Sequence, residues 1–436
     1  MLKRLDLRGV RGDLRGHLPD PTAADGRGGM APAVAAILDE VRAGGDAAVR
    51  SLTERFDGVN IDDLRVPRSE VRAGLDAVSS DVRSALEVAH DNIAGYHRTQ
   101  VRPDGRHERD GVVIRELRVP VGRAGLYAPG GRAPLASTVL MTAVPARVAG
   151  VAEVAVCSPP GPGGRLAPAV LAAAAIAGVD EVYRIGGAQA VAAMAYGTES
   201  VRAVDVIAGP GNRWVATAER LVAGEGAVGV PSAFTGPSEV AVVADDTTPV
   251  PLAAIDLVVQ AEHGPDGLAY LITWSETAAG RVEAEVARMA AASPRRAEIE
   301  STLRRGGYTV LVEDPRQAMA VANAVAPEHL EIMCGDPESL VPLVRNAGAV
   351  FVGPWTPASV GDYVAGPSHV LPTARSARFG SALSVDDFCK RIHVIEVDEP
   401  ALRRLAPHAA AIARSEGLEA HAESVLLRAG AGLRAT

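Results

Sequence analysis

Two short polar stretches carry the strongest candidates for chemistry in this chain. Gln260 and His263 lie three positions apart in QAEHGPD, near the end of a predicted helix. This spacing puts both side chains on one helix face, within reach of one metal ion. Glu328 and His329, in APEHLEIM, place a carboxylate beside an imidazole at the start of a predicted strand. Because neighbouring strand residues point to opposite sides, we expect two separate roles rather than one hydrogen-bonded dyad.

Further polar side chains stand at other predicted strand and helix ends. Ser238 lies in GPSE, Asp362 in the glycine-rich loop SVGDY, and His369 in GPSHVLPT. Glu416 and His421 lie five positions apart on a predicted C-terminal helix. Each motif alone is weak, because such residues are more often structural. The spacings exclude a zinc finger and an H-E-x-x-H protease.

Two glycine-containing stretches are candidates for binding a nucleotide. Residues 224–229, GEGAVG, match G-x-G-x-x-G but follow a predicted helix and lead into VPSAF. A dinucleotide fingerprint must follow a strand and open a helix, so we expect no standard Rossmann phosphate loop here. The stretch GPGN, residues 209–212, is better placed between a predicted strand and a helix, where free backbone N–H groups can meet a ligand. An ordinary turn with Asn212 as N-cap is the alternative.

The elements that must position these residues alternate along the chain. Residues 31–100 show helical periodicity, and short β runs alternate with helices from about residue 111. A second such series starts near Ser238, and the chain ends in a predicted helical tail. This alternation is typical of parallel sheets in α/β proteins. Two such layers leave a cleft, the usual place for a ligand.

Composition narrows the class of protein. The 436 residues are 47% hydrophobic and 22% charged, which indicates a soluble globular chain of several domains. The net charge of −9 argues against nucleic-acid binding. We expect no membrane span and no signal peptide, since no apolar run is long enough and the N-terminus is charged throughout. Three widely spaced cysteines predict no disulfide framework, so a reducing cytoplasm is expected.

Taken in order, the motifs resemble those of the histidinol dehydrogenases. The resemblance covers essentially the whole chain and is strongest between residues 122 and 421. Its matching stretches are GLYAPGGRAPLASTVLMTAVPARVAG, IGGAQAVAAMAYGT, IAGPGN, GPSEV, QAEHGPD, APEHLEI, GDYVAGPSHVLPT and EGLEAH. It implies a zinc-dependent, NAD-linked, four-electron oxidation of L-histidinol to L-histidine through L-histidinaldehyde, the last steps of histidine biosynthesis.

The resemblance also implies a role for each candidate residue. It places the zinc ligands at Gln260, His263, Asp362 and His421. It makes Glu328 and His329 the catalytic residues. Substrate contacts fall on Ser238, Gln260, His263, Glu328, His329, Asp362, Glu416 and His421. The NAD contacts fall on Tyr127, Gln189 and Asn212.

The fold implied by the resemblance has two Rossmann-like parallel-sheet domains without a G-x-G-x-x-G loop, plus small helical N- and C-terminal segments. The expected division is an N-terminal segment (1–30), a zinc and substrate domain (31–119 with 239–382), an NAD domain (120–238) and a tail (383–436). A homodimer is implied, with one zinc ion per subunit and His421 supplied by the partner's tail.

Two other classes of protein remain compatible with the residues themselves. A zinc hydrolase of an imidazole-containing substrate could use the same ligands with Glu328 as base, and it would turn over without NAD. A non-catalytic, two-lobed binding protein could keep the cleft without the chemistry. NADH formation separates the dehydrogenase from both alternatives.

Overall fold

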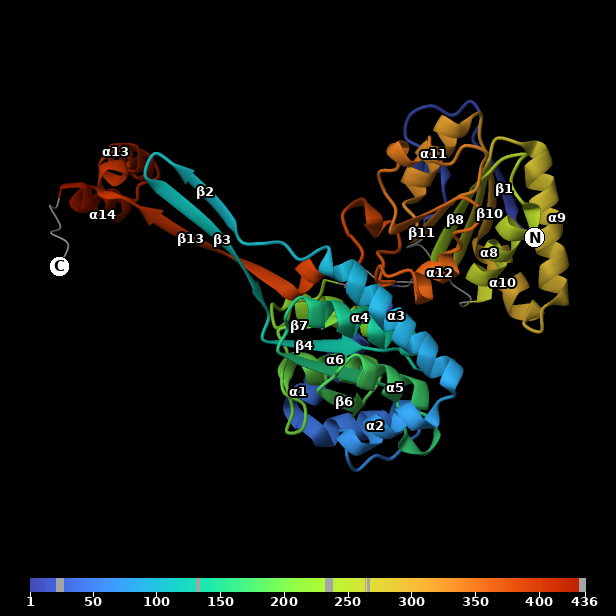
Figure 1. Ribbon diagram of the computed structural model, residues 1–436, viewed down its shortest axis with the longest axis horizontal. Coiled ribbons are helices and arrows are strands. Elements are labelled where there is room, and N and C mark those ends of the chain that lie inside the picture. Colours follow the sequence, from blue (N-terminus) through green and yellow to red (C-terminus); the bar gives the residue numbers. More distant parts are fainter. Residues whose placement is uncertain (21–26, 131–133, 232–237, 263, 265–266, 431–436) are drawn as a thin grey trace. The chain divides into compact units, whose positions relative to one another are not determined.

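The computed structural model describes residues 1–20, 27–130, 134–231, 238–262, 264 and 267–430 (Figure 1). The chain divides into two compact units, which are described separately below. The first unit comprises Met1–Gln100 and Val121–Phe388, and the second comprises Val101–Pro120 and Cys389–Thr436. Among the described helices, none combines the length and apolar character needed to cross a bilayer.

The larger sheet of the first unit has six parallel strands in the order β1-β10-β9-β8-β11-β12. Helices α8, α9 and α10 cover one face, and α11 covers the other. Strands covered on both faces become continuously apolar, as EVAVVA in β8 shows. The bounds are β1 Lys3–Asp6, β8 Glu239–Ala244, β9 Leu268–Thr273, β10 Gly307–Leu311, β11 His329–Ile332, β12 Ala349–Val352, α8 Val250–Glu262, α9 Glu276–Ala292, α10 Arg296–Gly306 and α11 Pro315–Val325.

The smaller sheet has four parallel strands in the order β6-β5-β4-β7. Helices α1, α6 and α7 pack on one face, and α2 to α5 pack on the other. The predicted α/β fold with two parallel sheets is confirmed. The bounds are β4 Arg123–Tyr127, β5 Glu153–Ser158, β6 Glu181–Arg184, β7 Val206–Ala208, α1 Arg27–Asp57, α2 Arg68–Ala77, α3 Ser80–Arg98, α4 Ala136–Val148, α5 Pro168–Ile176, α6 Gly187–Tyr196 and α7 Arg213–Gly224.

The helices in the N-terminal quarter of the chain pack on the four-stranded sheet, which differs from the predicted grouping. The sequence-based prediction groups residues 31–119 with residues 239–382, whereas α1 to α3 share their cores with the four-stranded sheet, as Leu52 and Ile93 do. The amphipathic pattern of a helix shows which face is buried but not which sheet it covers. The first residues form the edge strand β1, which pairs with β10. The boundaries between functional domains stay a prediction.

The second unit is an antiparallel sheet followed by two helices. The sheet consists of β2 (Gly105–Arg109), β3 (Val112–Pro120) and β13 (Cys389–Val397), with β3 in the middle. Helices α13 (Glu399–Ser415) and α14 (Glu419–Gly430) pack together through small alanine side chains. Large apolar side chains remain exposed on this unit, namely Ile392, Ile395, Val397, Leu405, Ile412, Leu418 and Leu427. Such a set is typical of a surface that another protein chain covers.

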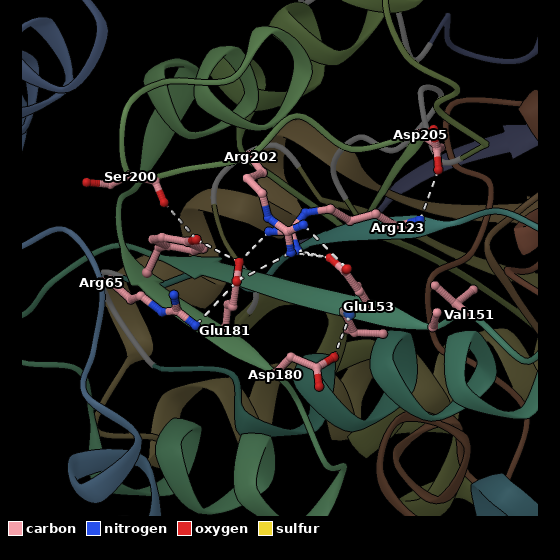
Figure 2. A network of polar contacts seen from close by, with 12 residues as sticks. Arg65, Arg123, Val151, Glu153, Asp180, Glu181, Ser200, Arg202 and Asp205 are labelled. Atoms are coloured by element: carbon pink, nitrogen blue, oxygen red, sulfur yellow. Dashed lines mark hydrogen bonds and ion pairs between the residues drawn. The ribbon is translucent and has the colours of Figure 1, made fainter.

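An ion network ties together the amino ends of three strands in the smaller sheet (Figure 2). Arg123 opens β4 and pairs with Glu153 at 2.8 Å and with Glu181, the first residues of β5 and β6. Glu181 also accepts a hydrogen bond from the Tyr183 hydroxyl at 2.7 Å. Arg123 is only 6% exposed, so its charge depends on these carboxylates. The network therefore has a structural role in fixing strand register.

Replacing Arg123 with methionine is expected to lower the free energy of unfolding by about 3 kcal/mol, because Glu181 would lose its buried partner. Denaturant titration followed by circular dichroism measures this loss. The double variant Arg123→Met, Glu181→Leu removes both charges and should recover much of the stability. A double variant less stable than the single one would contradict the explanation.

Candidate active site

A pocket of about 1030 Å³ lies at the carboxyl ends of the four-stranded sheet. Tyr127, the last residue of β4, lines it together with Gln189 in α6 and Asn212 before α7. The Tyr127 hydroxyl accepts a hydrogen bond from the Gly187 N–H at 3.1 Å. The structure thus brings all three residues predicted to contact NAD into one pocket. Its size and its place in the sheet suit a nucleotide.

The GPGN turn is compatible with both alternatives given above, a turn that faces a ligand and a turn in which Asn212 is the N-cap. Asn212 caps α7, because its Oδ1 accepts hydrogen bonds from the N–H groups of Trp214 and Val215 at 2.9 and 3.2 Å. The same residue also lines the pocket. Gly209 has φ +139°, and a Cβ there would lie 2.2 Å from the Tyr127 carbonyl oxygen, so only glycine fits. GEGAVG begins at the end of α7 and opens no helix, as predicted.

A second group of polar residues lies at the amino ends of two neighbouring strands in the six-stranded sheet. Ser238 precedes β8, and Glu328 precedes β11, which begins at His329. The Ser238 hydroxyl lies 2.6 Å from Glu328 Oε2 and 3.1 Å from Gln260 Oε1. The Glu239 N–H donates to the same Glu328 oxygen at 3.0 Å. Four of the predicted site residues therefore form one cluster.

The location of this cluster departs from the usual rule for open α/β sheets. Ligands usually bind at the carboxyl ends of the strands, next to helix N-termini that favour anions. At the amino ends a sheet presents helix C-termini instead, and α8 ends there just after Gln260. A helix C-terminus carries partial negative charge and favours cations. The position of the cluster therefore suits a metal ion or an ammonium group.

Asp362 joins the cluster from a short helix rather than from the loop that the sequence indicated. It lies in α12 (Ala358–Tyr363), and its Oδ1 is 3.3 Å from His329 Nε2. The Asp362 carbonyl oxygen is 2.8 Å from His369 Nδ1, and His369 Nε2 is 3.1 Å from the Thr138 hydroxyl. Because Thr138 belongs to α4, this chain of contacts links the cluster to the helices of the four-stranded sheet.

His329 is buried, with a carbonyl oxygen near one ring nitrogen and a carboxylate near the other. Its Nδ1 lies 3.1 Å from the Glu239 carbonyl oxygen, which can only accept, so this nitrogen carries a proton. Glu328 Oε2 lies 3.5 Å from Nδ1, an ion-pair distance, so the expectation that the two side chains point to opposite sides is wrong, because Glu328 precedes β11. Their separate roles stay a prediction. Burial opposes the charge on His329, but Glu328 and Asp362 outweigh it and raise the pKa of His329 to about 9. Burial also raises the pKa of Glu328.

The described residues include part of the predicted metal site. His263 lies outside the described residues. Glu416 follows α13, and His421 lies in α14; both are exposed on the second unit. Within the described part of the chain, no group of three His, Cys, Asp or Glu residues could hold a metal ion. The predicted zinc set as a whole therefore stays a prediction.

The geometry around Gln260 nevertheless fits a metal-binding amide. Ser238 has one proton, and the shorter contact to the Glu328 carboxylate takes it. The Gln260 amide then bonds Ser238 best through its nitrogen. Its oxygen would take the place of the buried Nε2, which has no hydrogen-bond partner among the described residues. An amide oxygen, a carboxylate and imidazoles form a donor set that zinc accepts.

A buried pair of carboxyl groups, which the sequence analysis missed, lies one step deeper. Asp256 stands one helical turn before Gln260 on α8, and Glu331 stands two residues after His329 on β11. The two side chains hydrogen-bond, and Glu331 Oε1 accepts from the Ala358 N–H at 3.0 Å, at the start of α12. The pair thus joins the three elements that carry the site. Spacings of four on the helix and two on the strand were the available signal.

Glu331 is expected to make stability depend on pH. Burial, and secondly Asp256, raise the pKa of Glu331 to about 9, so the folded state holds a proton that the unfolded state releases. This contribution is complete below the ordinary carboxyl pKa and is lost as pH rises toward about 9. Glu331→Gln should therefore gain in melting temperature relative to the parent from about pH 5 to about pH 9. The exposed Glu338→Gln is the control, and parallel pH curves for parent and Glu331→Gln would contradict the shared proton.

The fold places the chain among α/β proteins with parallel sheets, and its pocket has the size and the place of a nucleotide site. A family model for histidinol dehydrogenase matches residues 22–429. The chain is 47% identical over 396 residues to histidinol dehydrogenase of Parasynechococcus marenigrum (strain WH8102), covering 90% of this chain and 89% of the relative. It is 48% identical over 402 residues to that of Rhizobium meliloti (strain 1021), covering 92% of each chain.

A solved structure agrees with these relatives. The crystal structure of histidinol dehydrogenase from Elizabethkingia anophelis superposes with a TM-score of 0.91 at 32% identity and covers 98% of both chains. The chain belongs to the histidinol dehydrogenase family, NAD-dependent oxidoreductases that catalyse the final steps of histidine biosynthesis.

Proposed function

We propose that this chain oxidises L-histidinol to L-histidine through L-histidinaldehyde, with one zinc ion per subunit and two molecules of NAD per turnover. The observation that carries the proposal is the position of His329, buried between Glu328 and Asp362 with Nδ1 held by a carbonyl oxygen. The net reaction consumes one water and two NAD, and it yields two NADH, histidine and three protons.

Zinc would be held by Gln260, Asp362, His263 and His421 of the partner subunit. When bound, it supplies a Lewis-acidic anchor for the amino group and an imidazole nitrogen of the substrate. Glu416 and Ser238 would complete the contacts to substrate. The cluster lies at the C-terminus of α8, where the partial negative charge of the helix favours a bound cation. This position supports the proposed zinc site.

His329 would exchange protons through Nε2, since Nδ1 is committed to the Glu239 carbonyl oxygen. In the first oxidation Nε2 takes the hydroxyl proton of histidinol while hydride leaves its carbon for NAD. A cation bound to Asp362 would weaken the attraction between this carboxylate and the protonated His329. The neutral imidazole, which can act as a base, would then be favoured. One oxygen of Glu328 is held by Ser238 and the Glu239 N–H, so the other would activate the water that adds to the aldehyde.

Stoichiometry tests the proposal. Mixing the protein with NAD and histidinol should raise NADH absorbance to two equivalents per histidine formed. A chelator should abolish the reaction, and added zinc should restore it. No NADH would favour the hydrolase or the binding protein instead, while full activity in metal-free protein would remove zinc from the proposal.

A further inference from the structure

Asp57 is an acidic residue of the NAD pocket to which the proposed function gives no role. It is the last residue of α1, a helix that packs on the four-stranded sheet (Figure 1). Asp57 lines the same pocket as Tyr127 and Gln189. Its Oδ2 is buried and has no hydrogen-bond partner among the described residues. Burial raises the pKa of this carboxyl group.

The fold alone does not account for a carboxylate at this position. A negative charge at a helix C-terminus opposes the macrodipole, and a half-buried carboxylate whose buried oxygen lacks a donor costs further free energy. Asp46 on the same helix shows how a structural carboxylate is treated in this protein. It accepts hydrogen bonds from Ser200 and from Thr198 at 2.6 Å, and these lower the pKa of Asp46 although burial opposes them. Among the described residues, Asp57 Oδ2 has no such partner, so a ligand is the expected source of its donor.

The pocket around Asp57 shows what that ligand must offer. Phe56 and Val59 supply an apolar wall beside Asp57. Gln189 contributes a buried Nε2 that likewise has no hydrogen-bond partner in the part of the chain that the structure describes. A ligand that satisfies both groups needs hydroxyl donors and an acceptor, as a nucleoside ribose does. In Rossmann folds an acidic side chain after a strand binds the ribose 2′-hydroxyl. Here the acidic side chain comes from a helix end instead.

We propose that Asp57 accepts hydrogen bonds from the adenosine ribose hydroxyls of NAD and thereby excludes NADP. The proposal rests on the NAD-linked activity. The nicotinamide end must meet the substrate near His329, and the link to that cluster runs through Thr138 on α4. Because α1 and α4 pack on opposite faces of the four-stranded sheet, Asp57 belongs to the adenosine end. A 2′-phosphate there would set like charges together.

Binding of NAD and NADP, measured without substrate or zinc, tests the proposal. Trp214 lines the pocket, so quenching of its fluorescence gives both dissociation constants. The parent should bind NAD well and NADP poorly. Asp57→Asn should weaken NAD binding by about 10- to 100-fold, as expected for loss of hydrogen bonds to a charged group, and should strengthen NADP binding. Glu54→Gln, an exposed carboxylate one turn earlier on α1, is the matched control and should change neither constant.

Melting temperature without ligand separates this role from a structural one. Asp57→Asn removes an unpartnered charge, so the unliganded variant should melt at the same or a higher temperature than the parent. Equal weakening of NAD and NADP would place Asp57 at the nicotinamide ribose and overturn the proposal. Tight binding of NADP by the parent would also overturn the proposal. Arg165, which lines the same pocket, would then pair with the 2′-phosphate. Failure of histidinol oxidation with NAD binding intact would count against the proposed function and not against this inference.

Discussion

His329→Gln is expected to slow the oxidation of both histidinol and histidinal by about 10²- to 10⁴-fold, the usual loss when a general base is removed. The reason is geometric. Nδ1 of His329 is committed to the Glu239 carbonyl oxygen, which leaves Nε2 as the atom that can exchange protons. Glutamine can donate to the same carbonyl but offers no basic nitrogen. Single-turnover absorbance at the NADH band, started separately from each substrate, measures the two steps.

Glu328→Gln separates the two oxidations. Because only the aldehyde step consumes water, this variant should lose more rate with histidinal than with histidinol. NAD binding should persist in both variants, since neither residue lines the NAD pocket. His90→Gln, at a histidine on α3 that is partly exposed, serves as the matched control. Equal losses in the two steps for Glu328→Gln would refute the division of labour between Glu328 and His329.

The parts of the fold that follow from periodicity were predictable. Alternating strand and helix patterns placed both parallel sheets, and the context of GEGAVG correctly excluded a glycine loop. The edge strand β1 was missed because KRLD has no apolar face of its own and is ordered by pairing with β10. Asp362 was expected in a loop because α12 has only six residues, too few for a helical period to be recognised.

Parts of the site that depend on tertiary packing could not be read from the sequence. Asp256 and Glu331 are 75 positions apart in the sequence. They meet only because α8 packs on the six-stranded sheet that contains β11. Their residue types are those of ordinary exposed carboxylates, and the spacings to Gln260 and His329 do not by themselves show that the two meet. Asp57 likewise looks like a solvated helix end until its burial and its lack of a donor are seen. The location of the polar cluster at the amino ends of the strands also depends on how the sheet packs, so the sequence alone does not show it.

The predicted sharing of the zinc site between two chains has the sharpest test, because activity should appear from two inactive proteins. Asp362→Asn and His421→Asn should each purify with little zinc and almost no activity, since a site that lacks a strong ligand holds zinc poorly. After subunit exchange, a mixed dimer should have one site with an intact Asp362 from one chain and an intact His421 from the other. The second site of that dimer carries both lesions and should stay inactive.

Under random pairing of equal amounts, about a quarter of all sites should recover, which follows from the two-fold symmetry of a dimer. Zinc content should rise in the same proportion, and this readout is independent of turnover. The exposed apolar residues of the second unit support a partner surface there, and Ile412 on α13 is one of them. Mixing tagged chains shows whether exchange has occurred. If exchange occurs and neither zinc nor activity returns, His421 serves its own chain, and the shared zinc site is wrong.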